Sequence, residues 1–148
     1  MIYNRTESDV LESKKIRARL QNGETITQDE EKIMERGTIT INTLNRISQK
    51  QDELKSLFDE SGYFCGEVFV REWNYSDVFL LADFGRIIEN LTTLRKAFFT
   101  LRKTPANPLP RYHFSNINDL EKTLFDLERN LDYMIANFPE CGDYECGE

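Results

Sequence analysis

The stretch from Ile117 to Phe138, INDLEKTLFDLERNLDYMIANF, decides the fold of this chain. Its apolar residues recur at alternating intervals of three and four positions, which places them along one face of an α-helix. Pro139 follows, and proline cannot continue a helix. We therefore expect a heptad helix over residues 116–138, whose apolar seam packs within this chain or against another copy. The seam residues are Ile117, Leu120, Leu124, Leu127, Leu131, Met134 and Phe138.

The same region carries the charge of the chain. The formal net charge of the 148 residues is −7, and residues 112–148 contain nine acidic and two basic residues. This net negative charge argues against a protein that binds the phosphate backbone of nucleic acid through its overall electrostatic field. No nucleic acid is therefore expected as a partner. An acidic helix face is usually solvated, but it can also dock a basic partner. The candidate docking face, expected on the side opposite the seam, consists of Asp119, Glu121, Asp126, Glu128 and Asp132.

Four further helices are expected upstream. Thr6 stands three residues before Asp9, and Thr27 three residues before Glu30, which is the spacing of a capping box at a helix N-terminus. Apolar residues spaced by three and four positions mark two more helices. The predicted helices cover residues 7–22, 28–37, 41–60 and 83–101.

The remaining segments are not helical in this prediction. Aromatic and β-branched residues favour an extended segment or a short strand near residues 63–75, with Trp73 as a structural plug. Three prolines between residues 105 and 110 predict a linker. The chain is thus expected to be one mainly α domain, a small helical bundle of about five helices. Its parts are N-terminal helices (1–62), an extended aromatic segment (63–82), a central helix (83–101), a Pro-rich linker (102–115), the heptad helix (116–138) and a Cys-Gly acidic tail (139–148).

Residues with catalytic potential are sparse. His113 is the single histidine, so an acid–base or nucleophilic unit has one candidate imidazole. No phosphate loop, nucleophile elbow or His-Glu-x-x-His motif occurs. We expect a turn or packing role for His113, no catalytic residue, no cofactor and no enzymatic activity. No apolar run approaches the roughly 18 to 20 residues of a membrane helix, so no membrane span is expected.

The three cysteines, Cys65, Cys141 and Cys146, form an odd set. Together with His113 they have the composition of a Cys3His zinc site, but a second tightly spaced pair is missing. A disulfide between Cys141 and Cys146 is the other alternative. The sequence favours two small residues in a C-terminal turn and no metal, and it leaves the redox or metal state of the three cysteines open.

The run Lys14-Lys15-Ile16-Arg17-Ala18-Arg19 is the one local cationic patch. A helix that carries it can contact phosphates or an acidic partner. Pairing with the acidic residues that precede it explains the patch almost as well. The patch supports an alternative function, a small intracellular regulatory or adaptor protein that binds a protein or nucleic acid.

Three blocks of the chain resemble a known family. They are Ile2-Tyr3-Asn4-Arg5-Thr6-Glu7-Ser8-Asp9-Val10, Gly37-Thr38-Ile39-Thr40-Ile41-Asn42-Thr43-Leu44-Asn45-Arg46-Ile47 and Cys141-Gly142-Asp143-Tyr144-Glu145-Cys146-Gly147-Glu148. The blocks resemble a domain of virion-associated proteins in phages and prophages of low-GC Gram-positive bacteria, often in tail-fibre-like or baseplate-like contexts.

This resemblance implies a non-enzymatic structural protein of a tail, baseplate or fibre. We expect several copies per virion, a homo-oligomer, other virion proteins as partners, and a location in the virion after synthesis in the host cytoplasm.

Overall fold

The computed structural model describes residues 1–137 and contains five helices in the predicted order. No strand occurs within these residues. The prediction of a mainly α protein built as a small helical bundle is therefore confirmed. The helices are α1 (Glu7–Gln21), α2 (Gln28–Gly37), α3 (Ile41–Glu60), α4 (Leu81–Ala97) and α5 (Phe114–Asn137).

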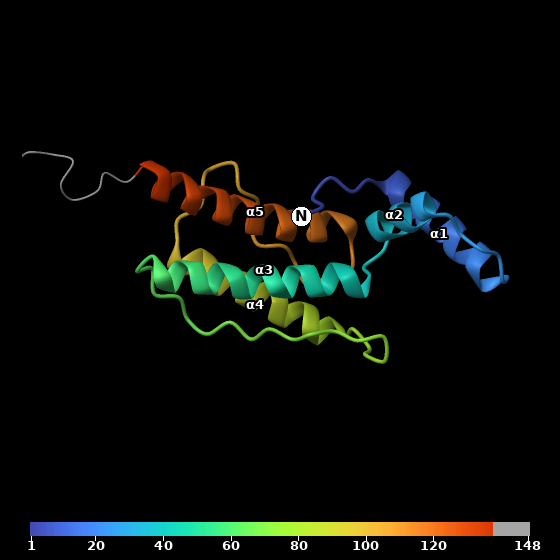
Figure 1. Cartoon of the computed structure of the whole chain (residues 1–148), viewed down its shortest axis with the longest axis horizontal. Helices are drawn as coiled ribbons and strands as arrows, with labels where there is room; N and C mark the ends of the chain where they lie inside the picture. The colour runs from blue at the N-terminus through green and yellow to red at the C-terminus, as the bar shows by residue number, and fades with distance from the viewer. Residues whose placement is uncertain (138–148) are drawn as a thin grey trace, which may run out of the picture.

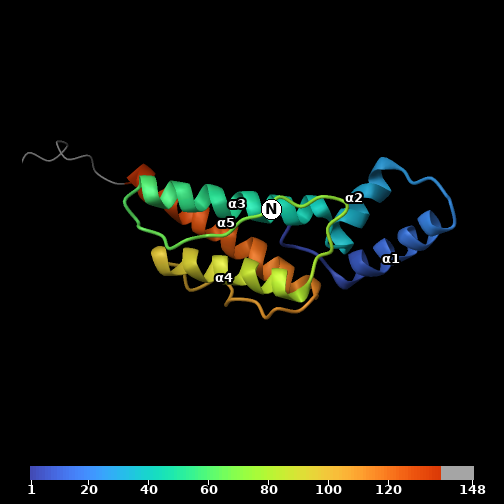
Figure 2. The ribbon, with the colours of Figure 1, turned by 90° about the horizontal axis from the view of Figure 1, so that it is seen from below.

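Helices α3, α4 and α5 form a three-helix bundle, and α1 and α2 form a hairpin at one end of it (Figure 1). The three bundle helices run in the same direction, as the colour gradient along each ribbon shows in Figures 1 and 2. Side-chain contacts agree, because Arg46 near the start of α3 pairs with Glu121 near the start of α5. Near the other end, Phe58 of α3 stacks on Phe98, which follows α4. All three N-termini therefore lie at the hairpin end.

Parallel helices require connections that travel back along the bundle. Residues 61–80 return from α3 to α4, and residues 98–113 return from α4 to α5 (Figure 2). The first connection is extended, as predicted, but the alternative of a short strand is not formed. Each return segment lies against the bundle and covers part of its surface.

Two asparagine side chains bind the backbone of the extended segment, as a partner strand would do in a sheet. Asn90 on α4 accepts a hydrogen bond from the N–H of Phe69 at 3.1 Å and donates one to its C=O at 2.9 Å. Asn45 on α3 makes the same pair of bonds with Trp73, at 2.7 and 3.0 Å. An amide side chain offers a donor and an acceptor, so each asparagine satisfies one extended residue without a sheet. We call each such pair an asparagine clamp.

The core lies where the three bundle helices meet. Burying each large apolar side chain stabilises the fold by about 1.5 to 3 kcal/mol. Trp73 is buried among them, which confirms its predicted role as a plug. Gln51 is also fully buried, and its Nε2 donates to the carbonyl oxygen of Ile87 at 2.8 Å. The buried apolar residues are Leu44, Ile47, Leu54, Phe58, Trp73, Phe84, Ile87, Leu91, Leu94, Phe98, Ile117, Leu120, Leu124, Leu127 and Leu131.

Helix α4 is displaced from the prediction, since it begins at Leu81 and ends at Ala97 rather than spanning 83–101. The chain leaves the helix at Phe98, which adopts an extended conformation with φ −139° and ψ 150°. The Phe98 ring packs against Phe58 and Tyr63, with centroid distances of 5.2 and 4.8 Å. Phe98 therefore belongs to the core, as its spacing predicts, but it reaches the core from outside the helix.

The hairpin of α1 and α2 is antiparallel, and both capping boxes predicted for it are present. Thr6 pairs with Asp9, and Thr27 pairs with Glu30. Gly37 lies where α2 comes into close contact with α1, and a Cβ atom at this position would clash with the Asp9 carbonyl oxygen. A larger residue at position 37 would force the helices apart.

Candidate docking site between the hairpin and the bundle

The carboxylate of Glu121 lies at the centre of an ionic cluster that joins four parts of the chain. Its side chain is 0% exposed and pairs with Arg5 of the N-terminal arm at 2.7 Å and with Arg46 of α3 at 2.8 Å. It also accepts a hydrogen bond from the N–H of Ile2 at 3.0 Å. Arg46 in turn pairs with Glu35 of α2 at 2.9 Å. Two cations compensate the cost of burying this carboxylate, so Glu121 joins the hairpin end to the bundle.

A third asparagine clamp supports the same cluster. Asn118 on α5 accepts from the N–H of Arg5 at 3.1 Å and donates to its C=O at 2.9 Å. The clamp fixes the backbone of Arg5 while Glu121 fixes its guanidinium. The N-terminal arm is thereby held against α5.

The predicted acidic docking face is wrong at Glu121 and Asp126, because both carboxylates are buried. Asp126 pairs with Lys122 of the same helix and accepts a hydrogen bond from the Thr104 hydroxyl at 3.1 Å. Both acidic residues flank the seam instead of opposing it. Segments distant in sequence cover them, and neither carboxylate is available to a basic partner.

The other three residues of the predicted face differ in exposure. Glu128 is half-buried and pairs with Lys50 of α3 at 2.8 Å. Asp119 is half-buried, and Asp132 is exposed. Docking of a basic partner through Asp119 and Asp132 stays a prediction.

The heptad seam of α5 packs inside the chain. Ile117, Leu120, Leu124, Leu127 and Leu131 belong to the buried core, and Met134 packs against it. This face is therefore unavailable to a second copy unless the bundle opens. Phe138 and the acidic tail with Cys141 and Cys146 lie outside the described residues.

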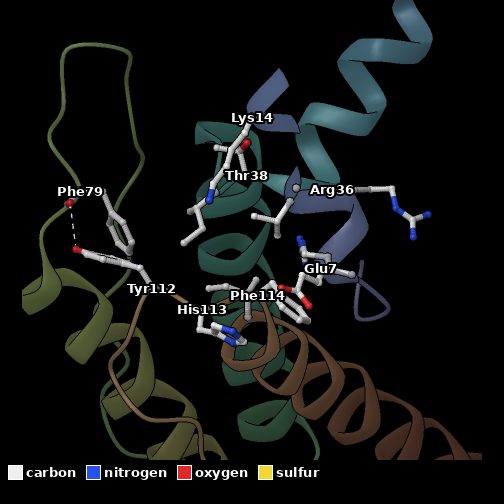
Figure 3. Close-up of a pocket in the computed structure, with 13 residues that line it drawn as sticks. Glu7, Lys14, Arg36, Thr38, Phe79, Tyr112, His113 and Phe114 are labelled. Carbon is white, nitrogen blue, oxygen red and sulfur yellow. Dashed lines mark hydrogen bonds between the residues drawn. The ribbon is translucent and has the colours of Figure 1, made fainter. Parts of the chain in front are cut away.

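A cavity of about 770 Å³ lies between the hairpin and the N-terminal end of the bundle (Figure 3). We call it the hairpin pocket. One wall comes from the N-terminal arm, α1, the end of α2 and the connection after it. The other wall comes from the ends of the two return segments and the start of α5. The residues used below are Arg5, Glu7, Lys14, Arg36, Phe79, Tyr112 and His113.

The hairpin wall of the pocket carries three cations, Arg5, Lys14 and Arg36, and one carboxylate, Glu7. Lys14 is exposed and takes part in no ion pair within residues 1–137. In Figure 3 its side chain extends from α1 toward the space between the hairpin and Phe79. The Arg36 guanidinium points away from that space, and its Nε lies 3.3 Å from Asp9. Arg5 is buried, and its Nη2 has no hydrogen-bond partner among the described residues. Lys14 is thus the cation that remains available, because Glu121 compensates the charge of Arg5 and Asp9 that of Arg36.

The opposite wall of the pocket is aromatic. The Tyr112 hydroxyl donates to the carbonyl oxygen of Phe79 at 3.2 Å (Figure 3). The two rings lie 5.6 Å apart, and Tyr112 stacks on Phe84 with a centroid distance of 6.1 Å. Burial raises the pKa of Tyr112, and the charge of Asp83 raises it further, so the hydroxyl stays protonated and acts as a donor. The pocket therefore combines one exposed cation, Lys14, with aromatic ring surface.

His113 lies at the edge of the pocket, where its Nδ1 is 2.7 Å from the Ser115 hydroxyl. This contact stands at the start of α5, as expected for a residue in a turn. No group of three His, Cys, Asp or Glu residues within residues 1–137 has a geometry that could hold a metal. Cys65 is a free, half-buried thiol whose pKa is raised by burial.

The cationic run on α1 is accessible in part. Lys14, Lys15 and Arg17 are exposed, whereas Arg19 pairs with Glu24 and Glu30 of the hairpin. In the part of the chain that the structure describes, no helix is long and apolar enough to cross a membrane.

Sequence reasoning missed the hairpin pocket. Its walls combine positions such as Lys14, Phe79 and Tyr112, which are far apart in the chain, and no local spacing relates them. The exposed lysine was visible as part of the cationic run, but the aromatic wall depends on where the two return segments end. Comparisons with protein-family models, with curated proteins and with solved structures find no match to this chain.

Proposed function

We propose that this protein is a non-enzymatic structural component of a phage virion, present in several copies at the tail, baseplate or fibre. The sequence blocks that resemble virion-associated proteins suggest this class. The observation that carries the proposal is the amount of large apolar surface left exposed. Phe64, Tyr75 and Val78 of the return segment are 90%, 93% and 72% exposed.

Large apolar side chains left exposed along one return segment favour contact with another protein. Covering each of these side chains would contribute up to about 1.5 to 3 kcal/mol. Leu80 and Leu81 extend the exposed apolar surface to the start of α4. A protein that works inside a permanent assembly can carry such a surface, because neighbouring subunits cover it from the time of assembly.

Mass spectrometry of purified intact particles from the source phage tests the proposal. We expect peptides of this chain at several copies per particle, quantified against a major virion protein as internal standard. A host cytoplasmic protein monitored in the same sample controls for contamination. Particles that lack the chain while infected or lysogenic cells contain it would contradict the proposal.

A second candidate function is a small intracellular adaptor, and the exposed cations Lys14, Lys15 and Arg17 favour it. In this case α1 would bind an acidic protein or nucleic acid. Binding of a DNA duplex or an acidic peptide can be measured for the wild type and for Arg17→Glu. Loss of tight binding in the variant would support the adaptor, and equal weak binding by both would exclude this use of α1.

A further inference from the structure

We infer that the hairpin pocket of one copy takes up the acidic tail, residues 138–148, of a second copy. The copies would then join head to tail. The inference rests on the multicopy part of the proposed function and adds which surfaces meet. Three observations carry it: the chemistry of the tail, the chemistry of the pocket and the reach of the chain.

The tail has the composition that the pocket fits. It contains four carboxylates, at Glu140, Asp143, Glu145 and Glu148, and no basic residue. It also contains two aromatic side chains, Phe138 and Tyr144. Such a segment pairs best with a surface that offers both cations and apolar rings.

The pocket offers both. Lys14 provides an exposed cation on the hairpin wall, and Tyr112 with Phe79 provides ring surface on the opposite wall. Arg5 also lines the pocket; its Nη1 pairs with Glu121, but its Nη2 is buried and has no hydrogen-bond partner among the described residues. A buried donor without a partner is costly, so a carboxylate that reached Arg5 would relieve that cost.

The reach of the chain favours a second copy as the source of the tail. Helix α5 has 24 residues, which gives a length of about 36 Å at 1.5 Å per residue. The pocket lies at the N-terminal end of α5, and the tail follows its C-terminal end. The 11 residues 138–148 span at most about 36 to 40 Å. Within one chain Glu140 and Asp143, three and six residues after the end of α5, would stay far from the pocket.

Joining copies in this way uses two different surfaces of the chain. Such a contact is heterologous, and when it continues from copy to copy it builds a ring or a helical stack. Both products are repeating assemblies, which fits a protein present in several copies.

A peptide of residues 138–148, with Cys141 and Cys146 replaced by serine and a fluorescent label at its N-terminus, tests the contact. Its anisotropy is titrated with the full-length protein. We expect binding that weakens as salt rises, because the contact is ionic in part. Lys14→Glu should weaken binding by about tenfold, since it places a carboxylate among carboxylates.

Lys15→Glu is the matched control, because Lys15 is also exposed on α1 but does not line the pocket. It should change the affinity by less than about twofold, as a charge outside the site does. Equal loss in both variants would overturn the inference in favour of a general cationic attraction. Binding of a scrambled peptide as tight as that of the native sequence would overturn it too.

Sedimentation of the full-length protein tests the second copy. We expect association that rises with concentration and that is about tenfold weaker in Lys14→Glu and in the tail variant Asp143→Lys/Glu145→Lys. Mixing these two variants should restore a contact between opposite charges. A chain that sediments as a monomer at all concentrations would overturn the inference, and the particle measurement would still decide the virion proposal independently.

Discussion

Asn90 on α4 bonds both the N–H and the C=O of Phe69, so one side chain does for this residue what a neighbouring strand does in a sheet. Its Nδ2 also donates to Gln51 on α3 at 3.1 Å. Asn90 thus connects two helices of the bundle and the return segment that crosses them.

Replacing Asn90 by alanine should destabilise the protein by about 2 to 3 kcal/mol, because the backbone groups of Phe69 and the amide of Gln51 lose their partner. Urea unfolding measures the loss, and faster exchange of the Phe69 amide hydrogen locates it. Thr93→Ala on the same helix is the control, since its hydroxyl bonds only to the Glu89 carbonyl of its own helix. A loss below about 0.5 kcal/mol in Asn90→Ala, the size usual for a surface change, would contradict the clamp.

Glu121→Ala should cost about 3 to 5 kcal/mol, because it leaves the buried Arg5 guanidinium without its carboxylate. The free energy of unfolding in urea checks this value. Glu128→Ala is the control, since Glu128 is half-buried and its pair with Lys50 is worth less than about 1 kcal/mol. Equal losses of unfolding free energy in the two variants would mean that the Glu121 cluster stabilises the fold no more than a half-buried ion pair does.

Two glycine-to-alanine changes should act in opposite directions. Gly37→Ala should destabilise the fold by about 1 to 3 kcal/mol, because the new methyl group meets the Asp9 backbone and overpacks the hairpin. Gly85→Ala in α4 should stabilise it by about 0.5 to 1 kcal/mol, because the site is open and alanine favours the helix. Thermal unfolding of both variants provides the comparison, and a shift of the same sign in both would contradict the packing described for Gly37.

The stability of the hairpin should fall in acid. The pKa of Glu30 lies below its ordinary value of 4.5, first because the Thr27 backbone N–H donates to it and then because Arg19 does. A carboxylate whose pKa is lowered by folding stabilises the fold fully above the ordinary value, and this contribution is lost as pH falls through the lower, folded value. NMR titration of Glu30 should therefore give a midpoint below 4.5.

Arg19→Gln should move that midpoint up, toward the ordinary value. Arg17→Gln is the control, since Arg17 forms no ion pair within the described residues, and it should leave the midpoint unchanged. A wild-type midpoint at or above 4.5 would contradict the capping geometry.

Local signals predicted most of the helices well. The bounds of α3 match the prediction. Both capping boxes occur at the predicted residues, Thr6 with Asp9 and Thr27 with Glu30. These features depend on interactions within three or four residues, which a sequence displays directly. The predicted end of α4 at residue 101 is wrong. The spacing of Phe98 fits a helix, but α4 ends at Ala97 and the Phe98 ring reaches the core from an extended backbone.

The candidate site could not be predicted to the same extent. In the sequence, Glu121 and Asp126 look like solvent-facing residues beside an apolar seam. They are buried because distant residues pack over them: Arg5 pairs with Glu121, and Thr104 donates a hydrogen bond to Asp126. No local sequence pattern predicts the asparagine clamps either, because the two residues of a clamp, such as Asn45 and Trp73, are far apart in the chain. Contacts across long separations depend on the direction of the helices, and no local pattern encodes that direction.

The shared direction of α3, α4 and α5 also constrains how the chain folds. No two of these helices can form a local helical hairpin, so their pairing must wait until a long loop has closed. The antiparallel α1 and α2 are joined by six residues, 22–27, and can pair early. Because α5 supplies the seam around which the bundle closes, a ribosome-bound chain that lacks α5 holds an incomplete core. The bundle can mature only after synthesis has passed α5, whereas the hairpin can form before then.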